Sequence, residues 1–187
     1  IESDPDVRHD FLHGFWCLPR GSDGRWDLAA ARYQPLLVLA EHGEPRCWQR
    51  IARYVSRYDD WPVLHYGETE SLALLRMAQR QGVSEQQQAR LRWRLVDVHA
   101  RIRQHWRLPL NSYGLKSVAS WRGFQWGQSG VDGAHALLWW RHWQGEGPER
   151  RGSSHALRWI FQYNRDDCRA TWAVADWLRH QDQAGGS

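Results

Sequence analysis

The sequence Tyr163-Asn-Arg-Asp-Asp-Cys-Arg-Ala-Thr171 lies in the longest helical pattern of the chain. Across residues 155–181 the apolar side chains recur every three or four positions, and this spacing predicts one long amphipathic helix. Tyr163 and Asp167 are four positions apart, so both project from one face of that helix. Such a phenol and carboxylate can position water beside a metal ion. The alternative is a core tyrosine next to a surface carboxylate.

The composition indicates a globular domain with a basic surface. The chain has 187 residues, 42% hydrophobic and 25% charged, which is enough to bury a real core. Its net charge is +4, and 24 of its 25 basic residues are arginine because Lys116 is the only lysine. Arginine suits phosphate contacts. The 14 tryptophans are expected mainly in the core, and exposed ones could stack on bases.

Cysteine spacing and hydropathy exclude several classes of protein. Cys17, Cys47 and Cys168 form no C-x-x-C pair, so neither a disulfide framework nor a zinc knuckle is expected. The chain has no apolar run of about 18 residues and no signal-peptide pattern. We therefore expect a cytoplasmic protein without membrane contact. Because the chain begins at Ile1 without methionine, we also expect it to be part of a longer protein, with a shortened first strand.

Strand patterns come first along the chain, and helical patterns follow. Strands are expected at residues 1–5, 11–18 and 62–66, and residues 26–40 fit either a strand or a helix broken by Pro35. Helices are expected at residues 44–57, 70–81, 84–106 (interrupted near Val96-Asp97), 111–119 (capped by Ser112), 133–144 (capped by Asp132) and 155–181. Residues 145–154 read as a polar loop and 182–187 as a flexible tail. This order predicts one α/β domain over residues 1–187, with a mixed central sheet flanked by helices.

Acidic residues follow two of the predicted strands. Glu2 ends the first strand, and His65-Tyr-Gly-Glu-Thr-Glu70 comes directly after the strand at residues 62–66. Side chains at such strand ends face a crevice in α/β sheets. Together with Asp167 they resemble a site for divalent metals, because Mg²⁺ and Mn²⁺ prefer carboxylate oxygens. Two such ions can clamp the attacking and leaving oxygens of a phosphodiester.

These acids resemble the motifs of the DEDD exonucleases (DnaQ-like, tyrosine variant) in the ribonuclease H-like superfamily. In that family the first motif is Asp-x-Glu, and Ile1-Glu2 is similar to its last two positions, so the aspartate would precede Ile1. The second motif is His-Asn-x-x-Phe-Asp. Here Glu70 takes the acidic position and Tyr66 replaces the asparagine.

The chain resembles more closely the YprB-like domain, which often follows a RecB-like nuclease domain in bacterial proteins. That branch commonly has His-Tyr-x-x-Tyr-Glu as its second motif, which is nearer to the sequence here. Tyr163 and Asp167 match the third motif, Tyr-x-x-x-Asp. Ser112-Tyr-Gly-Leu-Lys-Ser-Val-Ala119 resembles a Ser-Tyr-x-Leu-Lys helix seen in these folds.

The resemblance implies an RNase H-like fold and a two-metal nuclease, a 3′–5′ exonuclease acting on single-stranded ends. Glu2, Asp167 and the upstream aspartate would hold two Mg²⁺ or Mn²⁺ ions, and Glu70 would bind one ion directly or through water. Tyr163 would orient the attacking water. Asp167 is preferred over Asp166, because neighbouring helical residues point about 100° apart.

The resemblance also suggests contacts with DNA or RNA and with a covalently linked RecB-like nuclease domain. Lys116, His65 and Tyr66 are the candidates for binding nucleic acid. Lys116 reads equally well as a solvated helix residue, and His65 as a satisfied histidine at a strand end. Two other functions remain open: a catalytically inactive nucleic-acid-binding or docking module, and a structural domain that binds partner proteins through its tryptophans.

Overall fold

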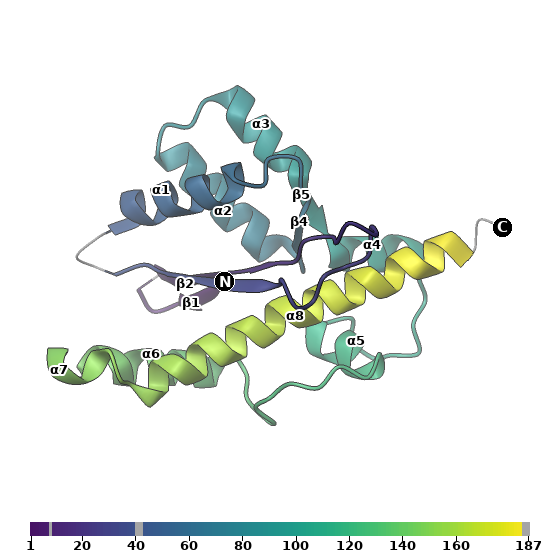
Figure 1. Ribbon diagram of the computed structural model, residues 1–187. Helices are drawn as coiled ribbons and strands as arrows, with labels where there is room; N and C mark the ends of the chain where they lie inside the picture. Colours follow the sequence, from purple (N-terminus) through teal and green to yellow (C-terminus); the bar gives the residue numbers. More distant parts are fainter. Residues whose placement is uncertain (8, 40–42, 185–187) are drawn as a thin grey trace. The chain divides into compact units, whose positions relative to one another are not determined.

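The computed structural model describes residues 1–7, 9–39 and 43–184 (Figure 1). The chain divides into two compact units, Ile1–Leu39 with Trp126–Arg169 and Ala40–Gln125 with Ala170–Ser187. Both units contain strands and helices, which confirms the α/β class. Within the described ranges, no helix is both long enough and apolar enough to cross a membrane.

An antiparallel sheet forms the first unit's strand layer. Its strands β1 (Glu2–Asp4), β2 (His9–Cys17) and β3 (Arg32–Leu37) lie in the order β1-β2-β3. Residues 26–40 therefore contain a strand, and Ala40 lies outside the described residues. Pro35 is tolerated because β3 has a partner strand on one side only.

Glu2 begins β1, so the expectation that it ends the first strand is wrong. The strand continues because Ser3 and Asp4 pair with Asp10 and His9 before the chain turns at residues 5–7. The pairing register shifts between Glu2 and Ser3, which marks an irregularity of the bulge type at the start of the strand.

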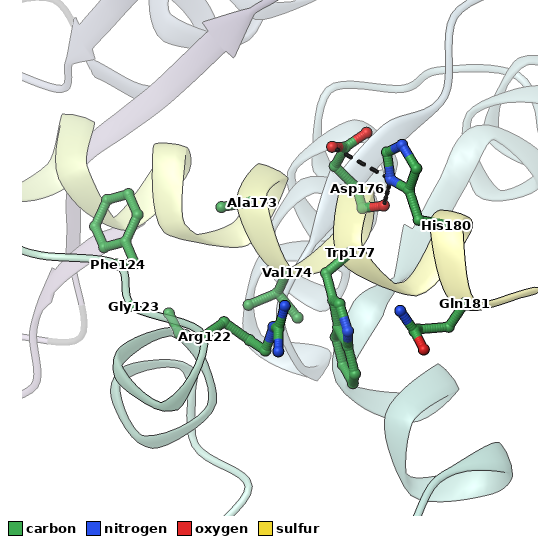
Figure 2. Close-up of a pocket in the computed structure, with 10 residues that line it drawn as sticks. Arg122, Gly123, Phe124, Ala173, Val174, Asp176, Trp177, His180 and Gln181 are labelled. Carbon is green, nitrogen blue, oxygen red and sulfur yellow. Dashed lines mark hydrogen bonds and ion pairs between the residues drawn. The ribbon is translucent and has the colours of Figure 1, made fainter.

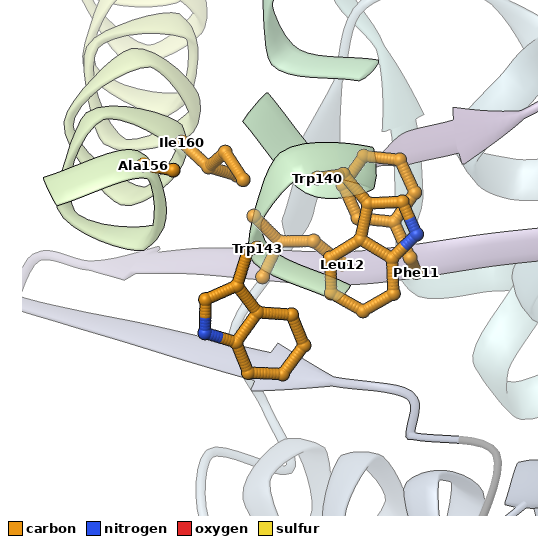
Figure 3. Close-up of a cluster of buried hydrophobic side chains, with 6 residues drawn as sticks. All are labelled: Phe11, Leu12, Trp140, Trp143, Ala156 and Ile160. Atoms are coloured by element: carbon orange, nitrogen blue, oxygen red, sulfur yellow. The ribbon is translucent and has the colours of Figure 1, made fainter. Parts of the chain in front are cut away.

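Three helices belong to the first unit: α6 (Gly133–Gly145), α7 (Pro148–Arg151) and the first half of α8 (His155–Ala184). The hydrophobic core of this unit takes side chains from α6 and α8. Phe11 of β2 stacks on Trp140 of α6 with ring centroids 4.5 Å apart, and Ile160 of α8 belongs to the same buried cluster (Figure 3). Asp132 caps α6 as predicted, since its Oδ1 accepts hydrogen bonds from the Ala134 and His135 amides.

Two expectations for the C-terminal third need correction. The polar loop at residues 145–154 contains the short helix α7. The expected flexible tail at 182–187 is wrong for residues 182–184, because α8 continues to Ala184. Residues 185–187 lie outside the described residues.

The second unit is built around two parallel strands, β4 (Val63–His65) and β5 (Leu95–Asp97). Its helices are α1 (Gly43–Ser56), α2 (Glu68–Arg80), α3 (Glu85–Arg94), α4 (Val98–His105), α5 (Leu115–Trp121) and the second half of α8. The helical stretch expected at 84–106 is therefore two helices separated by a strand. Leu95–Asp97 becomes a strand because it pairs with β4, a long-range contact that local periodicity does not report.

Side-chain caps begin two of the helices in this unit, but not α5. Ser84 accepts a hydrogen bond from the Gln87 amide at the start of α3, and Asp97 accepts one from the Ala100 amide at the start of α4. The cap predicted at Ser112 is wrong, because α5 begins at Leu115 and Gly114 occupies the cap position.

Candidate active site

Four polar residues of helix α8 are directed into the first unit rather than to solvent. Tyr163, Asn164 and Asp166 are 6%, 2% and 2% exposed, and Asp167 is half-buried. Burying polar groups is unfavourable unless each has a hydrogen-bonding partner. The partners of these four side chains therefore show what each of them does.

Glu2 and Asp167 lie near the hydroxyl of Tyr163. Burial raises the pKa of Tyr163 well above its ordinary value, and the negative charges of Asp167 and Glu2 raise it further. A hydrogen bond between Tyr163 and Asp167 acts in the same direction. Both carboxylates are therefore close enough to the phenol for their charges to act on it. Tyr163 is therefore neutral at physiological pH and can donate a hydrogen bond, but it is a poor general base.

The side-chain amide of Asn164 holds Glu2 in place. Its Nδ2 donates to Glu2 Oε1 at 2.9 Å, while its Oδ1 accepts from the Tyr33 hydroxyl at 2.9 Å. Burial also raises the pKa of Tyr33, so this phenol keeps the proton that it donates. With both ends of the amide engaged, Asn164 has one orientation, and Glu2 is held by a charge-assisted hydrogen bond.

Gly14 of β2 makes room for this amide. A Cβ atom at Gly14 would lie 1.7 Å from Asn164 Oδ1 and 3.1 Å from Tyr33 Cε2. No side chain fits at those distances without moving its neighbours. The glycine is therefore needed for the close approach of the strand to helix α8.

Adjacent carboxylates of α8 anchor adjacent residues of the segment before α6. Trp126 Nε1 donates to Asp167 Oδ1 at 2.8 Å, and the Gly127 amide donates to Asp166 Oδ2 at 3.0 Å. Asp166 also pairs with Arg169 at 3.3 Å. Asp166 is thus a buried anchor for this segment, whereas Asp167 lies beside Tyr163 and Glu2.

The other predicted site residues belong to the second unit. His65 is 7% exposed and its Nδ1 lies 2.7 Å from the Gly67 carbonyl oxygen, so it closes the turn after β4. Tyr66 donates its hydroxyl proton to the Tyr113 carbonyl at 2.6 Å, and burial raises its pKa. Both side chains therefore make internal hydrogen bonds.

The turn after β4 presents Glu70 on the first turn of α2. Gly67 has φ of 93°, a value that only glycine adopts without strain, and its amide donates to Asp97 Oδ1 at 3.0 Å. Asp97 therefore fixes the turn after β4 as well as capping α4.

Glu70 and Lys116 are both half-buried. Glu70 lies in the first turn of α2, and Lys116 lies in the first turn of α5.

Comparison with known proteins identifies the family. A family model of the RNase H superfamily matches residues 1–179. The chain belongs to the RNase H superfamily. No curated protein and no solved structure matches it. Membership of the RNase H superfamily indicates a nuclease-like hydrolase whose substrate is nucleic acid, and members of the superfamily generally use divalent metal ions.

The first unit offers oxygen ligands of the kind that RNase H superfamily metals require. Glu2 and Asp167 contribute carboxylates, each with one oxygen oriented by a nitrogen donor, Asn164 or Trp126. Two carboxylates facing one neutral phenol suit a hard cation such as Mg²⁺ or Mn²⁺. Among the described residues, no three His, Cys, Asp or Glu side chains come close enough together to form a metal-binding group. Glu70 belongs to the other unit.

Three residues of this site were not predicted from the sequence: Asn164, Tyr33 and Trp126. Asn164 stands three positions before Asp167, a spacing that places both on one side of the helix. Gly14, isolated in a strand of large side chains, is a second signal, because such a glycine often marks a close backbone approach. Nothing in the local sequence distinguishes Trp126 from the other tryptophans.

Proposed function

We propose that this member of the RNase H superfamily is a divalent-metal-dependent exonuclease that removes nucleotides from the 3′ end of single-stranded nucleic acid. The observation that carries the proposal is the shared neighbourhood of Glu2, Tyr163 and Asp167 in the first unit. The 3′–5′ polarity, the tyrosine-variant DEDD class and a linked RecB-like domain rest on the resemblance of the three motifs.

Glu2, Asp167 and the aspartate that the resemblance places before Ile1 would hold two Mg²⁺ or Mn²⁺ ions. By the same resemblance, Glu70 would bind one ion directly or through water. When bound, such ions activate water and stabilise negative charge on the phosphate. Asn164 and Trp126 keep the two carboxylates oriented before metal arrives. Their loss would weaken metal binding, as the loss of outer hydrogen-bonding partners generally does.

Tyr163 orients the attacking water in this proposal. Its hydroxyl carries a proton at physiological pH because of burial and the two nearby carboxylates. The phenol therefore donates a hydrogen bond to the water and does not remove a proton from it. Tyr163→Phe keeps the ring and removes only that donor.

The second unit would contribute the acid of the second motif and a contact with the strand. His65 and Tyr66 support this role by fixing the turn that leads into α2, the helix that carries Glu70. His65 bonds to the Gly67 carbonyl, and Tyr66 bonds to the Tyr113 carbonyl. Direct contact of His65 and Tyr66 with nucleic acid stays a prediction. Lys116 is the proposed phosphate contact.

Hydrolysis of a 5′-labelled single-stranded oligonucleotide with Mn²⁺ tests the proposal, using the full-length gene product. Asp167→Asn should lower the rate by about a hundredfold or more, the scale of losing a group that acts on the reacting atoms. Exposed Asp60 provides the control, because Asp60→Asn removes the same charge elsewhere. Equal rates for the two variants would overturn the role of Asp167.

Asp166→Asn separates the two neighbouring acids. It should lower stability through the loss of the Gly127 contact. Asp167→Asn should leave stability unchanged or higher, because it removes one of the two carboxylate charges that act on Tyr163. If the wild type binds the oligonucleotide but hydrolyses nothing with Mg²⁺ or Mn²⁺, the inactive nucleic-acid-binding module becomes the better function.

A further inference from the structure

The second unit contains a cavity of about 480 Å³ between the end of α5 and the last turns of α8 (Figure 2). Arg122 and Phe124 line it on the α5 side, and Trp177 and Gln181 line it on α8. None of the residues discussed above as metal ligands contributes to its wall. The cavity is therefore a separate feature from the cluster around Tyr163.

Arg122 and Trp177 line the cavity, and two indoles outside its wall, Trp121 and Trp106, pack beside them. The Arg122 guanidinium lies 5.3 Å from the Trp121 ring centroid and 5.2 Å from that of Trp177. The two indoles meet edge to face with centroids 5.5 Å apart, and Trp106 packs on Trp177 at 5.5 Å. Trp106 thus supports Trp177 from within the unit, while Trp121 remains 39% exposed.

Arg122 is held by rings and not by acids. In the described part of the chain its guanidinium makes no hydrogen bond or ion pair, although it has five N–H donors. Stacking on indole uses the face of the guanidinium and leaves its in-plane donors directed outward. That arrangement suits an incoming phosphate.

Asp176, the acidic residue in the cavity wall, does not repel an anion bound at Arg122, because its carboxylate is already paired with basic side chains. Asp176 Oδ1 pairs with Arg179 at 3.1 Å, and Oδ2 lies 3.6 Å from His180 Nδ1. Figure 2 shows Asp176 and His180 on one side of α8, and Trp177 and Gln181 on the other. The helical spacing explains this, since residues four apart share a face.

We propose that this cavity binds one nucleotide of a single-stranded nucleic acid, with its base against the aromatic rings of the wall, Trp177 and Phe124, and its phosphate on Arg122. Stacking on aromatic side chains tolerates every base, because every base has a π-face. The Gln181 amide, which carries both a donor and an acceptor, lies in the same wall and can meet a base edge. The site would hold the strand without taking part in its hydrolysis.

Fluorescence anisotropy of a labelled oligothymidylate of about twelve nucleotides tests the site, in EDTA so that no hydrolysis occurs. Trp177→Leu and Arg122→Ala should each weaken binding at least about fivefold, the lower end of the loss for one stacked base. Arg122→Ala should also reduce the salt dependence by about one phosphate contact. Binding by a hydrolytically inactive protein would still support the site, so this test is independent of the proposed activity.

Matched controls come from the same unit. Trp93→Leu removes an indole that is 82% exposed and outside the cavity, and Arg103→Ala removes an exposed arginine on α4. Both should bind within about twofold of the wild type. If the cavity variants bind as tightly as these controls, the proposal is overturned.

Photocrosslinking of the wild-type protein locates the bound strand without relying on any variant to fold correctly. An oligonucleotide carrying 5-iodouracil should form its adduct at Trp177 or Trp121, and adducts confined to other peptides would contradict the site.

Competition with thymidine monophosphate identifies the source of the nucleotide. Displacement by the monophosphate assigns the cavity to released nucleotides, and displacement only by unlabelled oligonucleotide assigns it to the strand.

Discussion

Replacing Gly14 with alanine should disturb the candidate active site, because the added methyl group would clash with the buried side-chain amide of Asn164. The added Cβ would lie 1.7 Å from Asn164 Oδ1 and 2.9 Å from its Cγ, well inside contact distance. Asn164 is 2% exposed and bonded at both ends, so it cannot move aside and keep its partners. We expect the hydrogen bonds from Tyr33 and to Glu2 to break together.

The size of the effect follows from those two bonds. A neutral hydrogen bond contributes about 1 kcal/mol to stability and one to a charged group about 1.5–3 kcal/mol, so their joint loss is about 2–4 kcal/mol. If the backbone moves instead, overpacking costs about 1–3 kcal/mol. Either response lowers the free energy of unfolding by more than 1 kcal/mol.

Urea unfolding, followed by fluorescence, measures this loss as a lower transition midpoint. Gly133→Ala is the matched control, because a Cβ there meets no atom within 4 Å. It should be neutral or stabilising by up to about 1 kcal/mol.

A double-mutant cycle identifies the contact responsible. In an Asn164→Ala background the clash partner is absent, so Gly14→Ala should destabilise the protein much less than it does alone. A destabilisation below about 0.5 kcal/mol in the otherwise wild-type chain, or an equal effect in both backgrounds, would refute the reasoning.

Three further changes probe other contacts of the two units. Burial and the nearby carboxylates raise the pKa of Tyr163 in the folded protein, whereas an unfolded tyrosine ionises near pH 10. The free energy of unfolding should therefore fall as pH rises above about 10, and it should fall less in Tyr163→Phe. Equal pH profiles for the two proteins would contradict this. Asp97→Ala should lower the free energy of unfolding in urea by about 1–2 kcal/mol, because α4 loses its cap and Gly67 loses its hydrogen-bond acceptor. A change within about 0.3 kcal/mol would rule this out. Trp126→Phe should raise the Mn²⁺ concentration for half-maximal hydrolysis by about ten- to a hundredfold, because Asp167 loses the donor that orients it. An unchanged Mn²⁺ requirement would show that Trp126 does not prepare Asp167 for metal binding.

The sequence alone determined features that depend on near neighbours in the chain. Apolar spacing predicted helix α8, and Asp132 was recognised as the cap of α6. The spacing of Tyr163 and Asp167 predicted that they share a helix face, and the structure places them in contact. Spacing and capping act within one or two helical turns, so they can be read directly from the order of residues.

Tertiary structure decided everything that depends on residues far apart in the chain. Leu95–Asp97 is a strand only because β4 lies beside it. Glu2 reaches Asn164, and Trp126 reaches Asp167, across segments with no common periodicity. These contacts depend on which surfaces pack together and on which buried polar atoms need partners, and both are properties of the folded chain. The sequence thus named the acids of the candidate site, while the fold supplied the amide and the indole that hold them.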